Sequence, residues 1–179
     1  KAADLAAMSR RRWFRPQRLM AVAATLVMLV GAGYLVTQSS QPPPPTGYAT
    51  TLGEQRTEAL SDGTEVVLNT DSAFEVQFSK NRRAIALTRG EAQFEVAHDT
   101  SRPFVVSIGG DTVTALGTRF QVRRESSSTI VTLLEGSVEV AHGQERHVLR
   151  PNERAVLSLR TGISIASVEP EFATGWVHG

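Results

Sequence analysis

The chain of 179 residues contains no cysteine, and only 6% of its residues are aromatic. Without cysteine, disulfide bridges and thiolate metal sites are excluded, and cysteine content does not point to either side of a membrane. Common metal-ligand spacings are also lacking among the four histidines, which are His98, His142, His147 and His178. We therefore predict no catalytic residue, no metal ligand and no cofactor, and we expect that the chain is not an enzyme.

Basic residues are scarce in most of the chain and concentrated at its start. Residues 1–18 hold one lysine and five arginines against Asp4 alone, whereas residues 47–179 hold 13 basic and 17 acidic side chains. A protein that binds nucleic acid needs a basic face to displace the counterions of the phosphates. The part of the chain that can fold lacks such an excess, so nucleic acid is not an expected partner. Because the first residue is Lys1, we expect the sequence to be a fragment of a longer protein.

Residues 19–36 form the one long apolar run, with 18 residues and no charge. As a helix they would reach about 27 Å, close to the ~30 Å hydrocarbon core of a bilayer. Five arginines precede the run closely, and no charged residue follows it until Glu54. The positive-inside rule then predicts a single transmembrane helix, with a cytoplasmic basic tail at 1–18 and a periplasmic C-terminal part. The predicted location is the bacterial inner membrane.

Two alternatives concern how this segment is used. A cleaved signal peptide is disfavoured, because the only Ala-x-Ala pattern near the apolar run, at residues 21–23, starts that run instead of following it. The pair Arg11-Arg12, followed by Trp13 and Phe14, resembles a twin-arginine export signal. The sequence does not decide between the general and the twin-arginine export routes.

Residues 37–47 contain four consecutive prolines, which cannot continue a helix and favour extended polyproline II. We interpret this stretch as a linker that holds the following domain away from the membrane. From residue 48 onward the apolar pattern changes to a period of two, as in Phe74, Val76 and Phe78, which alternate with Glu75 and Gln77. This alternation is typical of strands with one buried face.

Turn signals separate the predicted strands at intervals suited to an all-β domain over residues 48–170. They lie at Asp62-Gly63, Lys80-Asn81, Arg89-Gly90, Gly109-Gly110-Asp111, His142-Gly143, Pro151-Asn152 and Thr161-Gly162. About a dozen short strands are expected. A weak Leu-x-x-Gly repeat, at 60–63, 87–90 and 133–136, favours stacked strand–turn–strand units, but its spacing is irregular. Both a β-sandwich and a roll-like or solenoid-like form therefore stay open.

The stretch Ala115–Phe120 is the most distinctive part of this domain. We expect Leu116 and Phe120 to be buried and Gly117 to permit a tight turn or bulge between strands. Arg119 is a candidate contact for a protein partner, although an ion-paired or solvated arginine is the simpler interpretation. His142, Glu145 and His147 are interpreted as solvated residues of a polar loop.

Several motifs occur together in a specific combination. They are Gly53-Glu54-x-Arg56, Leu60-x-Asp62-Gly63-Thr64, Leu68-Asn69-Thr70-Asp71-Ser72, Arg89-Gly90-Glu91-Ala92-x-Phe94-Glu95-Val96-Ala97-His98-Asp99, Arg102-Pro103-Phe104-Val105-Val106, Ala115-Leu116-Gly117-Thr118-Arg119-Phe120-x-Val122 and Val131-Thr132-Leu133-Leu134-Glu135-Gly136-Ser137-Val138. Together with the arginine-rich flank, the apolar run and the linker, they closely resemble the FecR family of transmembrane anti-sigma factors over residues 10–170. The motif positions expected to matter for the structure are Gly63, Gly90, Glu91, Phe94, Leu116, Gly117, Thr118, Phe120 and Gly136.

The resemblance implies a signal transducer. In that family a cytoplasmic N-terminal domain holds an extracytoplasmic-function (ECF) sigma factor, and the periplasmic part contacts the signalling domain of a TonB-dependent outer-membrane receptor, often one for iron–siderophores. Most of the cytoplasmic domain is expected to be missing here, and residues 171–179 are expected to start a further periplasmic segment. The resemblance supplies no catalytic residues.

A second function class is a membrane-anchored carbohydrate-binding or cell-envelope module. Such a module would present several exposed aromatic side chains on one face. After the linker, the chain has only Tyr48 and Trp176 as tyrosine or tryptophan, which argues against this alternative. The inducing ligand, the receptor, the sigma factor and the oligomeric state are not specified by the sequence.

Overall fold

The computed structural model describes residues 26–31, 34 and 43–169. The chain divides into two compact units, Lys1–Gln41 and Pro42–Gly179. In the first unit, residues 26–31 and 34 are helical. No helix within the described residues is both long and apolar enough to cross a bilayer. The remainder of the predicted membrane segment 19–36 lies outside the described residues, as do the basic tail 1–18 and the segment 171–179.

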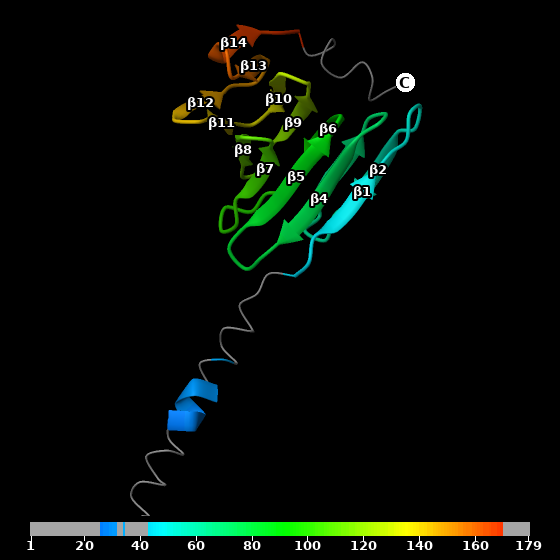
Figure 1. Ribbon diagram of the computed structural model, residues 1–179. Coiled ribbons are helices and arrows are strands. Elements are labelled where there is room, and N and C mark those ends of the chain that lie inside the picture. Colours follow the sequence, from blue (N-terminus) through cyan, green and yellow to red (C-terminus); the bar gives the residue numbers. More distant parts are fainter. Residues whose placement is uncertain (1–25, 32–33, 35–42, 170–179) are drawn as a thin grey trace, which may run out of the picture. The chain divides into compact units, whose positions relative to one another are not determined.

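The second unit is built from two seven-stranded sheets, with no helix in its described part (Figure 1). Sheet A contains, in spatial order, β1 (Thr46–Ala49), β4 (Ala73–Phe78), β5 (Arg83–Arg89), β7 (Phe104–Ile108), β8 (Asp111–Ala115), β11 (Val138–His142) and β12 (Glu145–Leu149). Sheet B contains β2 (Arg56–Ala59), β3 (Glu65–Leu68), β6 (Glu91–Glu95), β9 (Arg119–Arg124), β10 (Ser128–Glu135), β13 (Glu153–Ser158) and β14 (Gly162–Ser167).

The strand order explains why two architectures were compatible with the sequence. In both sheets the strands follow chain order from one end to the other, so the chain advances in one direction while it passes between the sheets. The hairpins β4–β5, β7–β8 and β11–β12 belong to sheet A, and the hairpins β2–β3, β9–β10 and β13–β14 belong to sheet B. Of the strand pairs in the described region, β5 and β7 alone are parallel, because β6 of sheet B intervenes between them. The domain is thus a two-sheet sandwich wound progressively in the manner of a solenoid.

Aromatic rings join the two sheets at the centre of the core. Phe94 of sheet B packs edge-to-face against Phe74 and Phe104 of sheet A, with ring centroids 6.4 and 5.7 Å apart. It also stacks on Phe120 of β9 at 5.3 Å. All four rings are at most 1% exposed. Burying rings of this size supplies much of the apolar area that stabilises a small β domain.

The predicted turn signals all fall in or beside the connections between strands. Gly63 and Gly90 have φ angles of +85° and +77°, a region in which side chains with a Cβ are strained. Gly63 lies in the connection between β2 and β3, and Gly90 lies between β5 and β6. The turn residues therefore predicted correctly where seven of the connections between strands lie.

Two sequence-based expectations are corrected. Strand β1 begins at Thr46, inside the predicted linker 37–47, because Thr46 and Gly47 pair with Val76 and Glu75 of β4. Leu116 is 43% exposed instead of buried. It lies in the turn between β8 and β9, where side chains no longer alternate between the two faces of a sheet. Phe120, the other residue expected to be buried in this stretch, is fully buried.

Candidate functional site

Most of the motif residues meet around β6, β9 and β10 of sheet B. Phe94 and Phe120 face the core and stack on each other. Gly117 and Gly136 lie where the chain enters β9 and leaves β10. Val96 donates its backbone N–H to the carbonyl of Thr118 at 3.0 Å, which extends the pairing of β6 and β9 beyond the strands. These positions build the centre of the fold.

Glycine is required at two of these positions by close approach. A Cβ on Gly117 would lie 2.5 Å from Nδ1 of His98, and one on Gly136 would lie 2.7 Å from the methyl group of Thr118. Either distance is far below van der Waals contact. Thr118 itself is buried, and its hydroxyl oxygen has no hydrogen-bond partner within the described part of the chain.

The carboxylate of Glu91, at the start of β6, accepts hydrogen bonds from two neighbouring side chains. One carboxylate oxygen accepts a hydrogen bond from Nδ2 of Asn69 at 2.7 Å, and the other accepts one from Nε2 of Gln121. Ser72 additionally accepts the backbone N–H of Glu91 at 2.9 Å. The motif glutamate therefore ties the β3–β4 turn to the outer face of β9.

Arg119 lies on the outer face of sheet B, within a row of four charged residues. In the strand register Glu65 of β3 is opposite Glu95 of β6, Glu95 is opposite Arg119 of β9, and Arg119 is opposite Glu135 of β10. We call these four residues the charged row. The guanidinium of Arg119 lies 3.8 Å from the carboxylate of Glu135, and its side chain is 47% exposed. Arg119 is thus accessible and paired with an acid on one side.

Arg83, a residue that the sequence patterns did not single out, makes four polar side-chain contacts. Its side chain is fully buried and forms an ion pair at 2.9 Å with Asp62, whose side chain is 3% exposed. Three other N–H groups donate to backbone carbonyl oxygens, those of Arg102 at 2.9 Å, Ala97 at 2.8 Å and Asp99 at 3.3 Å. The guanidinium also lies 5.5 Å from the ring centroid of Phe104.

These contacts fix the connection between β6 and β7. Asp62 also accepts hydrogen bonds from the backbone and hydroxyl groups of Thr64, so one buried arginine links the β2–β3 turn to the chain at residues 97–102. A signal for this role was present in the sequence. Arg83 lies in phase with Ile85 and Leu87, so strict alternation places a charged side chain on the buried face.

Asp99 organises the same connection from its exposed side. Its carboxylate accepts hydrogen bonds from the hydroxyl of Ser101 at 2.6 Å and from Nε of Arg102 at 2.9 Å. Hydrogen bonds from Ser101 and Arg102 hold the pKa of Asp99 well below its ordinary value of 3.8. The carboxylate is therefore charged in the folded domain at neutral and mildly acidic pH.

A small polar hollow of about 200 Å³ lies near the β7–β8, β9–β10 and β11–β12 turns. Nδ1 of His142, at the end of β11, lies 2.6 Å from the carboxylate of Asp111, which begins β8. The interpretation of His142, Glu145 and His147 as residues of a polar loop was wrong, because all three belong to strands of the β11–β12 hairpin. Among the described residues no group of three or more potential His, Cys, Asp or Glu ligands forms a metal site.

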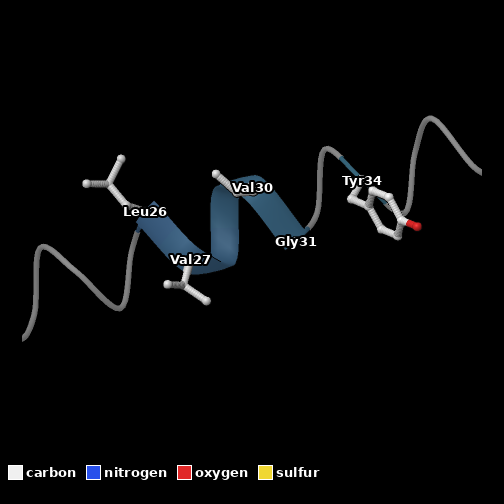
Figure 2. Close-up of a pocket in the computed structure, with 5 residues that line it drawn as sticks. All are labelled: Leu26, Val27, Val30, Gly31 and Tyr34. Carbon is white, nitrogen blue, oxygen red and sulfur yellow. The ribbon is translucent and has the colours of Figure 1, made fainter.

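The helical residues of the first unit carry apolar side chains that project in several directions. Figure 2 shows Leu26, Val27, Val30 and Tyr34 around the helix, beside an open hollow that they line together with Gly31. Their exposed fractions range from 57% for Leu26 to 71% for Val27. A helix that is apolar all round is typical of a protein interior or of a membrane.

Comparison with known proteins places this fold in a family. Two crystal structures of a candidate anti-sigma factor from Parabacteroides distasonis, at 2.50 and 1.65 Å resolution, are similar to the chain, with TM-scores of 0.71 and 0.70. Both are 29% identical, and the matches cover 76% and 75% of this chain. They cover 66% and 65% of those chains, so this chain matches about two thirds of their length.

No curated protein matches the chain. The family model described as FecR protein matches residues 46–139, which begin with β1 and extend into β11. The match includes the motif residues of β6 and β9 and the Arg83–Asp62 pair. The chain belongs to the FecR protein family.

Proposed function

We propose that the chain is the membrane-anchored sensing part of a regulator that controls an ECF sigma factor. The observation that carries this proposal is the FecR family membership of the β domain, supported by its similarity to a candidate anti-sigma factor. The domain acts through protein contacts and not by turnover. Sheet edges such as β2 and β14 provide unpaired backbone groups that can accept a partner strand.

The proposed topology follows from the charge distribution along the chain. Residues 19–36 cross the inner membrane once, residues 1–18 stay in the cytoplasm, and the β domain lies in the periplasm. The apolar side chains around residues 26–34 support this arrangement, because they suit a lipid environment. The prolines before β1 keep the domain away from the headgroups.

The proposed periplasmic partner is the signalling domain of a TonB-dependent receptor, and iron–siderophore uptake is the proposed stimulus. Binding of that domain changes how the single helix is held or presented for cleavage in the membrane, and the sigma factor is released. The carbohydrate-binding alternative gains no support from Tyr48, because its ring stacks on Phe74 at 4.9 Å instead of standing free.

Gene deletion tests the regulatory proposal. Comparing transcription in the deletion strain and in a strain complemented with the gene should show altered expression of one sigma-dependent gene set, and that sigma factor should co-purify with the regulator. Unaltered transcription combined with binding of the protein to cell-wall polysaccharide would instead support the envelope module.

Iron limitation tests the stimulus separately. The sigma-dependent genes should respond to a siderophore in the complemented strain and lose that response in the deletion strain. If deletion alters transcription but the genes do not respond to iron or siderophore, the proposed sigma-factor control stands and the proposed iron–siderophore stimulus is wrong.

A further inference from the structure

The outer face of sheet B carries two glutamates whose charges are not balanced locally. Glu65 and Glu95 are exposed and directly opposite each other on the antiparallel strands β3 and β6. Directly opposed side chains have Cβ atoms about 5 Å apart, and like charges at that separation repel. Neither carboxylate takes part in an ion pair or hydrogen bond within the described residues. Arg119, the neighbour of Glu95 on β9, is instead within 3.8 Å of Glu135.

A second observation at the same place concerns Gln93. It precedes Glu95 by two residues on β6, while Ala92 and Phe94 face the core, so Gln93 shares the outer face with Glu95. Gln93 is 8% exposed, and its side-chain oxygen has no hydrogen-bond donor in the described part of the chain. Its neighbour Gln121 on β9 directs its N–H donor to Glu91 instead. A buried acceptor without a donor is rare in folded proteins.

We propose that Glu65, Gln93 and Glu95 form a docking site for an arginine-bearing segment of a partner protein. Glu65 and Glu95 offer two exposed carboxylates, and Gln93 adds an amide oxygen that is buried and that a partner reaches only when the Gln93 side chain rotates outward. A guanidinium has five N–H donors in one plane and no acceptor, so it matches such a set better than the compact, strongly hydrated ammonium of lysine. Two carboxylates are fewer than a calcium or magnesium site normally uses, which favours an organic cation.

The charge of the whole domain agrees with a cationic partner. Residues 47–179 carry 17 acidic against 13 basic side chains, and the charged row concentrates three glutamates beside one arginine. Such a field increases the association rate of a basic segment and has the opposite effect on an acidic one. The site does not depend on which receptor or sigma factor the regulator serves, so peptide binding and the transcription experiment can fail independently.

The test is titration of the ¹⁵N-labelled full chain with a threonine pentapeptide that carries arginine at its second and fourth positions. We expect saturable shifts of the Gln93 side-chain amide and of the backbone amides of β3 and β6. Glu95→Gln should weaken binding about tenfold, because a charge-assisted hydrogen bond is lost. The matched control is Glu75→Gln, an exposed glutamate on the outer face of sheet A that is opposite Gly47 and Ala86. This control should bind as the wild type does.

Several results would overturn the proposal. Equal binding of a peptide in which citrulline replaces arginine would show that the positive charge is irrelevant. Equal affinities of the Glu95→Gln and Glu75→Gln variants, or shifts confined to sheet A, would place the contact elsewhere. If calcium shifts the same amides and the arginine peptide has no effect, the site binds a metal ion and not a partner segment.

A second variant separates binding from folding. Methionine has a shape similar to that of glutamine but lacks the buried side-chain oxygen that has no hydrogen-bond donor. The melting temperature of Gln93→Met should therefore equal or exceed that of the wild type, while its peptide binding should be weaker. Glu95→Gln should likewise not lower the melting temperature, because it removes repulsion from Glu65. If Gln93→Met binds the peptide as tightly as the wild type does, Gln93 does not contribute to the site.

Discussion

At the scale of single residues, the buried ion pair Arg83–Asp62 is the feature whose disruption is expected to destabilise the domain strongly. Both side chains are almost completely shielded from water, and three further N–H groups of Arg83 donate to backbone carbonyls. Desolvating two charges costs several kcal/mol per ion, and good geometry only partly returns that cost. The main role of the pair is therefore to fix the position of the β6–β7 connection. Its net contribution to the free energy of unfolding is small.

We predict that Arg83→Met lowers the free energy of unfolding by about 3–5 kcal/mol, because Asp62 is left buried without its partner. The double variant Arg83→Met/Asp62→Asn should lose less than the sum of the two single variants. Urea denaturation of all four proteins measures this coupling. Additive losses would mean that the two side chains stabilise the domain independently.

The charge on Asp99 gives a second prediction at the residue scale. Because its pKa is lowered in the folded state by hydrogen bonds from Ser101 and Arg102, Asp99 contributes stability above its unfolded pKa, near 4. This contribution is lost as the pH falls through the lower pKa of the folded state. The stability difference between wild type and Asp99→Asn should be constant from pH 7 to about pH 5 and shrink below about pH 4. Thermal melts at each pH measure it, and a difference that grows on acidification would contradict the assignment.

At the scale of elements, the turns and glycines determine where each strand stops. Gly90 lies between β5 of sheet A and β6 of sheet B, so it redirects the chain from one sheet to the other. Its backbone carbonyl accepts the N–H of Arg124 at 2.8 Å, and a Cβ at this position would lie 2.7 Å from the backbone oxygen of Asp71. Both a positive φ angle and a close approach therefore require glycine here.

Gly53 provides a matched control for Gly90. It has a similar φ of +86°, but no atom lies within 4 Å of the position that a Cβ would occupy. Gly53→Ala should therefore cost only the backbone strain of about 1–2 kcal/mol, whereas Gly90→Ala should cost at least about 1 kcal/mol more through the steric clash. Chemical denaturation compares the two variants, and equal losses would show that the Ser72–Asp71 turn moves away without cost.

At the scale of the whole molecule, the position of the β domain relative to the membrane is a proposal with a direct test. Alkaline phosphatase fused after Gly179 should be active, because the positive-inside rule places that end in the periplasm. A cytoplasmic reporter at the same site should be inactive. The reverse pair of results would invert the proposed topology.

Prediction from sequence succeeded where the physical cause is local. Alternation of apolar residues, as in β4 and β11, identifies a strand whatever its partner is, and the glycine turns indicate where it stops. The expected burial of Leu116 was wrong because periodic patterns lose their meaning inside a turn. The first two residues of the edge strand β1, Thr46 and Gly47, were assigned to the linker because they have no strand signature, and their pairing with β4 is what makes them part of a strand.

The sequence by itself determined the β character of the domain, the positions of its turns and its FecR family motifs. Only the tertiary structure decided that the strands form two sheets in chain order, that Arg83 meets Asp62, and that Glu65 lies opposite Glu95. The reason is that local patterns depend on neighbours a few residues apart, whereas each of these contacts joins residues about 20 or more positions apart. Such contacts exist only once the chain has closed the loops between them, and the pattern of a single strand does not specify its partner.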